Sequence, residues 1–426
     1  MTPSLEITPR GPLTGVIRPP GSKSITNRAL ACAALADGDS LLTGALKSDD
    51  TDVMVDSLNR LGINVTFDID RRELHVVGCG GKVPTSTADL FVGNSGTTVR
   101  FLAALVALGH GTYRLDGTPR MRQRPIGDLL DALVKLGVDA KSEPGTGCPP
   151  VVIQAQGIKG GQSHVRGDVS SQFLSGLLMA APYADASVEL VVDGELVSKP
   201  YVTMTLEVMK AFGVKVEPGD LSRFPIDRGV YRGQKYSIEP DASAASYFFA
   251  AAAITGGEIT VEGLSRDSLQ GDVAMVDLLE KMGCTAVWGA NSVTVRGAPL
   301  RGITTDMNAI SDTVQTMSAV ALFADGPTTI TGVAHIRHKE TNRISAVVTE
   351  LRKLGAEVDE FADGLTIHPG PLHGAEIDTY DDHRMAMSMA LAGLRVPGVV
   401  IRDPDCVRKT YPEYFKDLGS LEDLRR

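Results

Sequence analysis

The segment 21–28 brings together residue types that can hold an anion. It reads Gly-Ser-Lys-Ser-Ile-Thr-Asn-Arg and stands directly before an apolar helix expected over residues 29–36. The free N–H groups of a helix start, the positive end of the helix dipole and the side chains of Lys23 and Arg28 would all attract the same oxyanion. The segment is not a Walker loop, because serine rather than glycine precedes Lys23. An ordinary capped helix with solvated cations accounts for these eight residues equally well.

Cations stand at five of the twelve helix starts that we expect along the chain. A cation at a helix N-terminus opposes the helix dipole by about 0.3–1 kcal/mol. Besides Lys23 and Arg28, the residues concerned are Arg122 and Arg124, Lys339 and Arg343, Arg384, and Arg408 with Lys409. A purely structural explanation gives no reason why so many cations occupy positions that the helix dipole makes unfavourable. The pattern therefore favours a site for polyanionic ligands, held by Arg forks and Lys point charges.

Three further helix starts carry small or hydroxyl-bearing residues. The turn 93–98 contains Asn94 and Gly96, and its N–H groups can approach a carboxylate or phosphate closely because glycine has no side chain. The other two starts offer Ser170, Ser171 and Gln172 in one case, and Ser198 and Tyr201 in the other. Simple helix capping remains an alternative interpretation of all three.

Two carboxylates stand apart from the other acidic residues. Asp312 precedes an apolar helix, and Glu340 lies between Lys339 and Arg343. An acid and a base among cations would suit proton transfers on a phosphate-bearing substrate. The alternatives are an N-cap for Asp312 and a salt-bridge partner for Glu340.

Several classes of function are disfavoured. There is no H-E-x-x-H, no Cys/His cluster, no G-x-G-x-x-G after a strand and no G-x-S-x-G, so we expect neither a metal nor a dinucleotide cofactor. A net charge of −10 argues against general nucleic-acid binding. The five scattered cysteines, the lack of a signal-peptide pattern and the short apolar run at 247–255 favour a cytoplasmic protein without membrane spans.

The elements that position these residues repeat about every seventy residues. One component is a nearly all-apolar helix followed by a strand, and its helices are expected at 27–36, 97–108, 171–181, 244–254, 312–323 and 383–394. The other is an amphipathic helix with a glycine cap, ending at Gly62, Gly137, Gly213, Gly283, Gly355 and Gly419. This alternation predicts an α/β protein of six βαβ-type units.

The last unit is short of strands, because few residues follow position 419. The segments 5–7 and 15–17 are able to supply them. We therefore expect two similar domains of three units each, one formed by residues 1–21 plus 241–426 and the other by 22–240, with an active site in the cleft between them.

Seven segments of this chain resemble signature segments of the 5-enolpyruvylshikimate-3-phosphate synthase family of enolpyruvyl transferases. They are Pro-Gly-Ser-Lys-Ser at 20–24, Asn-Ser-Gly-Thr at 94–97, Pro-Arg-Met-Arg-Gln-Arg-Pro at 119–125, Asp-Val-Ser-Ser-Gln at 168–172, Arg-His-Lys-Glu-Thr-Asn-Arg at 337–343, Asp-His-Arg-Met-Ala-Met at 382–387 and Lys-Thr-Tyr-Pro at 409–412. The resemblance runs from about residue 19 to 415 in the expected order.

The resemblance implies an enolpyruvyl transferase fold of two domains, each with three βαβαββ units and buried central helices. It implies transfer of the enolpyruvyl group of phosphoenolpyruvate to the 5-hydroxyl of shikimate 3-phosphate, with release of phosphate through a tetrahedral intermediate in the shikimate pathway of aromatic amino acid biosynthesis. No metal or other cofactor is required. We expect a monomer without nucleic-acid or membrane partners.

The family's functional residues map onto this chain by motif. Those implied for shikimate 3-phosphate are Lys23, Ser24, Arg28, Ser170, Ser171, Gln172, Ser198, Tyr201, Asp312, His335 and Lys339. Those implied for phosphoenolpyruvate are Lys23, Asn94, Gly96, Arg124, Gln172, Arg343, Arg384 and Lys409. Asp312 resembles the base that takes the 5-hydroxyl proton, Glu340 resembles the group that protonates and deprotonates the methylene carbon, and Lys23 shares that work.

Two positions depart from the family pattern. His335 stands where some members have Asn, and Phe101 stands where many have Pro. Gly96 is retained, which resembles the glyphosate-sensitive form.

Two other functions remain as alternatives. UDP-N-acetylglucosamine enolpyruvyl transferase shares the fold and donor but has a reactive Cys ahead of an Arg-Pro segment, and residues 117–124 contain none. A non-catalytic anion-binding protein would need neither Asp312 nor Glu340 for its role.

Overall fold

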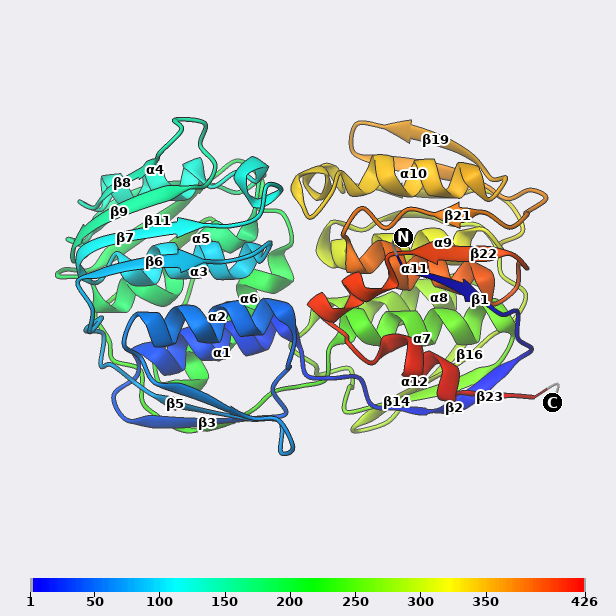
Figure 1. Cartoon of the computed structure of the whole chain (residues 1–426), viewed down its shortest axis with the longest axis horizontal. Helices are drawn as coiled ribbons and strands as arrows, with labels where there is room; N and C mark the ends of the chain where they lie inside the picture. Colours follow the sequence, from blue (N-terminus) through cyan, green and yellow to red (C-terminus); the bar gives the residue numbers. More distant parts are fainter. Residues whose placement is uncertain (1–2, 425–426) are drawn as a thin grey trace. The chain divides into compact units, whose positions relative to one another are not determined.

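The computed structural model describes residues 3–424 and divides the chain into two compact units (Figure 1). The N-terminal unit is Gly21–Ile238. The C-terminal unit combines the chain up to Pro20 with the chain from Glu239 onward.

Three sheets build the N-terminal unit, in strand orders β13-β3-β5-β4, β6-β7-β9-β8 and β10-β11-β12. The strands are β3 (Asp39–Thr43), β4 (Val65–Asp68), β5 (Glu73–Val77), β6 (Thr87–Phe91), β7 (His110–Asp116), β8 (Asp139–Ser142), β9 (Val151–Gln156), β10 (Gly161–Arg166), β11 (Val188–Asp193), β12 (Arg223–Ile226) and β13 (Lys235–Ser237). The helices are α1 (Lys23–Leu35), α2 (Asp49–Arg60), α3 (Gly96–Val106), α4 (Gly127–Lys135), α5 (Ser171–Ala180) and α6 (Lys199–Ala211), with short 3₁₀ helices η1 (Met121–Gln123) and η2 (Ala181–Tyr183).

The repeating unit is clearest in the second sheet. Strands β6 and β7 are parallel and joined through α3, whereas β9 pairs antiparallel with both β7 and β8. A parallel pair needs such a crossover, which is usually a helix. Every residue of α3 is buried, as its nearly unbroken apolar sequence predicts. The element order of this unit is β6-α3-β7-α4-β8-β9.

The C-terminal unit repeats the plan with sheets β15-β16-β14-β2-β23, β17-β18-β20-β19 and β1-β22-β21. Its strands are β1 (Ser4–Ile7), β2 (Leu13–Ile17), β14 (Glu258–Glu262), β15 (Thr285–Trp288), β16 (Ser292–Arg296), β17 (Thr304–Asp306), β18 (Thr328–Thr331), β19 (Glu357–Phe361), β20 (Gly364–His368), β21 (Glu376–Ile377), β22 (Val399–Arg402) and β23 (Glu422–Asp423). Its helices are α7 (Ala242–Thr255), α8 (Met275–Met282), α9 (Val314–Ala321), α10 (Arg343–Lys353), α11 (His383–Gly393) and α12 (Tyr414–Ser420), with 3₁₀ helices η3 (Gly271–Ala274), η4 (Asn308–Thr313), η5 (Ala334–His338) and η6 (Pro404–Lys409).

The core of the C-terminal unit lies around α7, α9 and α11. All fourteen residues of α7 are buried, and half of them are Ala, whose small side chains let neighbouring helices approach closely. Ser246 on α7 and Thr316 on α9 lie 3.1 Å apart, oxygen to oxygen, and Thr316 lies 3.4 Å from Ser388 on α11. These buried hydroxyls bond one another, so the helix contact is satisfied without solvent.

The two N-terminal strands join different sheets of the C-terminal unit. Strand β1 pairs antiparallel with β22, while β2 pairs parallel with β14 and antiparallel with β23. Strand β1 therefore completes the sheet of the last repeat, which contains β22, whereas β2 belongs to the sheet that contains β14.

The glycine caps follow the predicted pattern with one exception. Gly62, Gly137, Gly213, Gly283 and Gly355 have φ between +81° and +122° at the ends of their helices, which is the left-handed conformation that favours glycine. The prediction for Gly419 is wrong, because α12 continues through it to Ser420 before β23. The alternative interpretation of Asp312 as an N-cap is wrong, since Asp312 lies inside η4 and Thr313 precedes α9.

Candidate functional site

The start of α1 presents Lys23 as its first residue. Ser22 caps the helix by accepting from the Ile25 N–H at 3.4 Å. The Lys23 ammonium lies 3.6 Å from a carboxylate oxygen of Asp50, and both side chains are nearly buried. Asp50 belongs to the first turn of α2, where the helix dipole favours a carboxylate. Lys23 is unfavourable for the dipole of α1, and its charge is balanced by Asp50, which is favourable for the dipole of α2.

Arg28 is fully buried between α1, α5 and α6. Its Nε donates to Thr205 Oγ1 at 2.7 Å, and its Nη2 donates to Ser175 Oγ at 3.2 Å and to the Tyr201 carbonyl at 3.1 Å. Nη1 donates to the Ser24 carbonyl at 3.1 Å, so four of its five N–H donors are used within the protein. Burial lowers the pKa of Arg28 to about 10. Arg28 therefore joins three helices as well as offering charge.

The turn before α3 places Arg124 against the backbone. Arg124 is 3% exposed, and its Nη1 donates to the Asn94 carbonyl at 2.8 Å and to Asn94 Oδ1 at 3.2 Å. A Cβ added to Gly96 would lie 2.4 Å from Arg124 Nη2. The absence of a side chain at Gly96 is thus what admits the guanidinium of Arg124.

Sequence reasoning missed Arg100, a buried residue of α3. Its Nη1 donates to Gln172 Oε1 at 2.6 Å, its Nη2 donates to the Pro125 carbonyl at 3.0 Å, and its guanidinium lies over the Phe173 ring. The only sequence signal was an arginine within an otherwise apolar helix, a position that charged side chains rarely occupy without a partner.

The remaining predicted residues of this unit occupy the starts of α5 and α6. Ser170 is the N-cap of α5, and its Oγ accepts from the Gln172 N–H at 3.3 Å, so the capping interpretation is correct for that hydroxyl. Ser198 precedes α6 in a left-handed conformation with φ 53° and makes no side-chain cap bond. The ring of Tyr201 lies under the Arg28 guanidinium at 5.8 Å.

In the C-terminal unit, the guanidinium of Arg343 binds three carboxylates. Nε and Nη2 donate to Asp382 at 2.8 and 3.2 Å, Nη2 also donates to Glu340 Oε2 at 2.8 Å, and Nη1 donates to Asp312 Oδ1 at 3.2 Å. Arg343 is 1% exposed. Both carboxylates singled out from the sequence are therefore held by one buried cation.

Three further cations surround the same carboxylates. Arg384 Nη2 donates to Asp312 Oδ2 at 2.8 Å, and Lys339 Nζ lies 3.6 Å from Asp312 Oδ1. Lys409 Nζ lies 3.9 Å from Glu340 Oε1. With Arg343, four cations lie among Asp312, Glu340 and Asp382, and Asp272 and Asp381 lie close enough to interact with the same charges. Cations thus gather here in a protein whose net charge is negative.

Burial and neighbouring charges shift several ionisations here. Burial alone would lower the pKa of Arg343, but Asp382, Glu340 and Asp312 together raise it above its ordinary value. Burial lowers the pKa of Lys339, with the nearby Asp312 acting in the opposite direction. Burial, followed by the charge of Lys339, lowers the pKa of His335 to about 3. His335 is thus a neutral imidazole that can exchange hydrogen bonds but carries no charge.

Asp272 is a buried carboxyl outside the set of predicted site residues. It lies in η3, is 4% exposed and accepts a hydrogen bond from the Ser243 hydroxyl. Burial and the charge of Asp312 raise its pKa to about 6. No motif marks this residue, because its environment is created by α7 and η4.

Asp382 also escaped prediction as a site residue. It is fully buried and caps α11 by accepting from the Arg384 N–H at 3.0 Å. The two residues before it, Tyr380 and Asp381, are both left-handed. The Tyr380 hydroxyl donates to Glu350 at 2.6 Å, which holds this strained turn in place.

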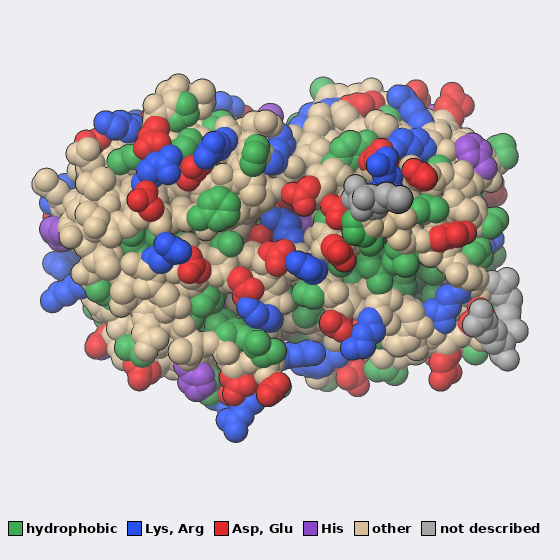
Figure 2. Space-filling model, viewed as in Figure 1, with side chains coloured by type: hydrophobic (Ala, Val, Ile, Leu, Met, Phe, Trp, Pro, Cys, Tyr) green, Lys and Arg blue, Asp and Glu red, His purple; other side chains and the backbone are tan. Residues whose placement is uncertain are grey.

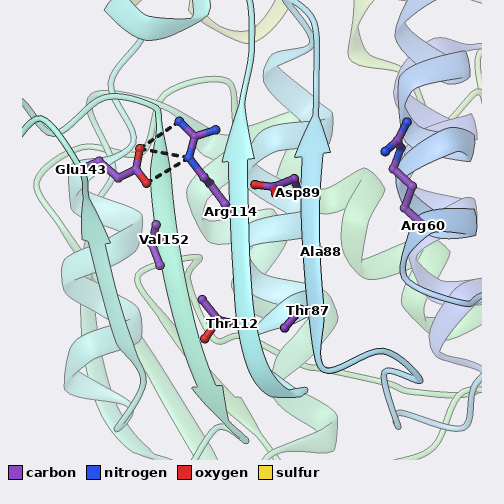
Figure 3. A pocket seen from close by; sticks show the side chains of 8 residues that line it. All are labelled: Arg60, Thr87, Ala88, Asp89, Thr112, Arg114, Glu143 and Val152. Atoms are coloured by element: carbon purple, nitrogen blue, oxygen red, sulfur yellow. Dashed lines mark hydrogen bonds and ion pairs between the residues drawn. The ribbon is translucent and has the colours of Figure 1, made fainter.

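A separate cavity of 720 Å³ lies in the N-terminal unit on the face of β6 and β7 (Figure 3). Its lining includes Arg60, Asp89, Arg114 and Glu143 and none of the predicted site residues. Arg114 donates to Glu143 through Nε and Nη2 at 2.9–3.1 Å. This arginine is therefore already neutralised by a carboxylate.

Cations and carboxylates are interspersed on the face of the molecule in Figure 2, unlike the continuous basic surface of a nucleic-acid binder. Within residues 3–424, no three His, Cys, Asp or Glu side chains gather in a way that would hold a metal ion. In the same range, every helix is too short or too polar to cross a membrane.

Comparison with known proteins gives concordant results. Residues 7–418 match the family model described as EPSP synthase (3-phosphoshikimate 1-carboxyvinyltransferase). The chain is 51% identical over 407 residues to a 3-phosphoshikimate 1-carboxyvinyltransferase of Nostoc punctiforme, covering 95% of each chain. It is 49% identical over 433 residues to the chloroplastic 3-phosphoshikimate 1-carboxyvinyltransferase of Arabidopsis thaliana, covering 96% of this chain and 82% of the relative.

Among solved structures, EPSP synthase from Acinetobacter baumannii aligns with a TM-score of 0.82 at 24% identity, covering 98% of this chain and 99% of that one. The enolpyruvyl transferase NikO from Streptomyces tendae aligns with a TM-score of 0.78 at 21% identity, covering 99% and 98%. These alignments confirm the predicted fold class.

Proposed function

We propose that this chain, which belongs to the EPSP synthase (3-phosphoshikimate 1-carboxyvinyltransferase) family, transfers the enolpyruvyl group of phosphoenolpyruvate to the 5-hydroxyl of shikimate 3-phosphate. Inorganic phosphate is the second product. Relatives at about half identity carry the name of this activity, which favours it over UDP-N-acetylglucosamine enolpyruvyl transfer. The enzyme acts in the shikimate pathway of aromatic amino acid biosynthesis.

One observation carries the proposal at the level of chemistry. The single guanidinium of Arg343 binds both Asp312 and Glu340, so a base and an acid are oriented by one rigid, planar group. The cations gathered here, Arg343, Arg384, Lys339 and Lys409, are the groups that would bind the carboxylate and phosphate of phosphoenolpyruvate. A non-catalytic anion-binding protein would have no need of the two carboxylates.

The proton transfers follow from these positions. In the addition step, Glu340 gives a proton to the methylene carbon of phosphoenolpyruvate, and the 5-hydroxyl oxygen attacks the adjacent carbon while Asp312 takes the hydroxyl proton. In the elimination step, Glu340 recovers a proton from the new methyl group as the bond to phosphate breaks. Lys23 takes part in these proton transfers.

Substrate contacts are proposed as the family motifs imply. Shikimate 3-phosphate is held by Lys23, Ser24, Arg28, Ser170, Ser171, Gln172, Ser198, Tyr201, Asp312, His335 and Lys339, and phosphoenolpyruvate by Lys23, Asn94, Gly96, Arg124, Gln172, Arg343, Arg384 and Lys409. Burial supports this assignment, since Lys23, Arg124, Arg343, Arg384 and Lys409 are all less than 10% exposed. Buried cations of this kind gain most from an anionic ligand.

Glyphosate is proposed as an inhibitor that competes with phosphoenolpyruvate. Gly96 lets the Arg124 guanidinium lie where an added Cβ would be only 2.4 Å from Nη2, and a small dianionic compound would bind that guanidinium in place of phosphoenolpyruvate. An assay at rising glyphosate and subsaturating phosphoenolpyruvate tests this, and a protein indifferent to glyphosate contradicts it. We further propose a cytoplasmic monomer.

A coupled assay for phosphate release tests the function directly. Release is expected only when shikimate 3-phosphate and phosphoenolpyruvate are both present, with 5-enolpyruvylshikimate 3-phosphate detected by mass spectrometry. Substituting UDP-N-acetylglucosamine for the acceptor tests the alternative enzyme. The Asp312→Ala and Glu340→Ala variants are expected to lose turnover and keep substrate binding. Absence of phosphate release from folded protein with both substrates would refute the proposal.

A further inference from the structure

Arg100 contacts Gln172 and the residue next to Arg124, and the proposed function assigns both Gln172 and Arg124 to phosphoenolpyruvate. Arg100 lies one turn after Gly96 on α3 and is 4% exposed. Its Nη1 donates to Gln172 Oε1 at 2.6 Å, and its Nη2 donates to the carbonyl of Pro125, the residue after Arg124, at 3.0 Å. The Phe173 ring lies 5.1 Å from its guanidinium carbon, which restrains the plane of the guanidinium from one side.

The contact with Gln172 determines which way the amide faces. A guanidinium has only donors, so the amide oxygen of Gln172 has to point toward Arg100. The amide nitrogen with its two N–H donors then points away from Arg100. Gln172 is only partly buried at the start of α5, so those donors are available to an oxyanion. Without Arg100, the amide is able to rotate and present its oxygen, which repels an anion.

The contact with Pro125 holds the segment that carries Arg124. Pro125 leads from η1 into α4, and its carbonyl is held by the guanidinium of Arg100. Arg124 itself is held by Asn94 on the other side of the Gly96 turn. A Cβ at Gly96 would meet Arg124 Nη2 at 2.4 Å and Arg100 Nη1 at 3.0 Å. The two guanidinium groups therefore approach the same side of Gly96.

We infer that Arg100 is a positioning residue for phosphoenolpyruvate binding, which acts by orienting the Gln172 amide as a donor and by holding the segment that carries Arg124. The inference rests on the proposed function. A lysine at position 100 keeps the positive charge, but its single ammonium cannot bond Gln172 and Pro125 in the fixed geometry of a guanidinium.

A double-mutant cycle tests this role. The variants are Arg100→Lys, Gln172→Ala and the double variant, and the measurement is the KM of phosphoenolpyruvate and kcat at saturating shikimate 3-phosphate. Arg100→Lys is expected to raise this KM about tenfold, the effect of one lost hydrogen bond to a charged group, with kcat changed less than about threefold. In the Gln172→Ala background, the same substitution is expected to raise KM less than about threefold.

Arg114→Lys is the matched control, because Arg114 lies in the same unit, binds a carboxylate (Figure 3) and lies outside the proposed site. Its KM and kcat are expected to equal those of the wild type. Far-UV circular dichroism and thermal unfolding check that each variant folds. Should Arg100→Lys fail to fold, Arg100→Gln, whose amide still donates one hydrogen bond, replaces it under the same criteria.

Three results would overturn the inference: an unchanged KM in Arg100→Lys, an equal rise in KM in both backgrounds, or a fall in kcat alone. A folded wild-type protein without phosphate release overturns the proposed function instead. The two failures are therefore distinguishable.

Discussion

The Gly96→Ala variant should change the geometry of the proposed phosphoenolpyruvate site without changing the stability of the fold. The new Cβ would lie 2.4 Å from Arg124 Nη2 and 2.9 Å from Arg124 Cζ, where ordinary contacts begin at 3.4 Å. The guanidinium has to move by about 1 Å, and it is held at 2.8 Å by the Asn94 carbonyl. Displacements of this size at a binding group reduce activity by about 100-fold in the extreme case.

The fold should tolerate the change. Gly96 is the first residue of α3 and does not have a left-handed backbone, and Ala has a higher helix propensity than Gly. The loss is therefore expected in substrate binding. One charged hydrogen bond contributes about 1.5–3 kcal/mol, so kcat/KM for phosphoenolpyruvate should fall about 10- to 100-fold. The KM of shikimate 3-phosphate should change much less, because Gly96 belongs only to the phosphoenolpyruvate set.

The assay is phosphate release at saturating shikimate 3-phosphate, over a range of phosphoenolpyruvate concentrations. Gly219→Ala is the control, because no atom lies within 4 Å of its added Cβ and its backbone is not left-handed. That variant should behave as the wild type. A Gly96→Ala variant with an unchanged KM for phosphoenolpyruvate would refute the reasoning.

Three further predictions concern buried charges. Glu340→Gln keeps an oxygen for Arg343 but cannot transfer a proton, so kcat should fall by about 10²–10⁴. In heavy water, this variant should not exchange deuterium into the methylene group of phosphoenolpyruvate. Retained exchange would contradict the role of Glu340. Asp272→Asn tests a carboxyl whose pKa is raised from 3.8 to about 6, so its contribution to stability is present below pH 3.8 and lost as pH rises through 6. The variant should therefore gain stability over wild type between pH 4 and 7, by up to roughly 3 kcal/mol, and urea midpoints that differ equally at every pH would exclude this. Arg28→Lys should destabilise the protein by about 2–4 kcal/mol in urea unfolding, because an ammonium cannot satisfy acceptors on three helices; a loss below about 0.5 kcal/mol would show that these bonds are dispensable.

Local structure was largely predictable because its causes are local. The apolar helices at 97–108 and 244–254 correspond to the buried helices α3 and α7, since a helix apolar on all sides has no stable place at a surface. Gly62 and Gly355 cap their helices because only glycine enters the left-handed region without strain. Gly419 followed the same local pattern and was wrong, because α12 continues one residue further before the chain pairs with β2.

The network of contacts within the site was not predictable in the same way. Arg384 and Asp312 are separated by 72 residues, as are Arg100 and Gln172. Arg28 and Ser175 are separated by 147 residues. Sequence identifies residue types able to pair, but the packing of helices decides which pairs come within 3 Å. Arg100 and Asp272 were missed for this reason, since each takes its role from neighbours on other elements.

By itself, the sequence determined the repeating α/β pattern, the family and the residue types that make up the candidate site, because these depend on periodicity and on motifs of a few adjacent residues. Only the tertiary structure decided that one guanidinium binds Asp312, Glu340 and Asp382, that His335 is a neutral imidazole, and that Arg28 joins three helices. Hydrogen bonds depend on distance and angle, and ionisation depends on burial, so both are determined by the packed chain and not by the order of its residues.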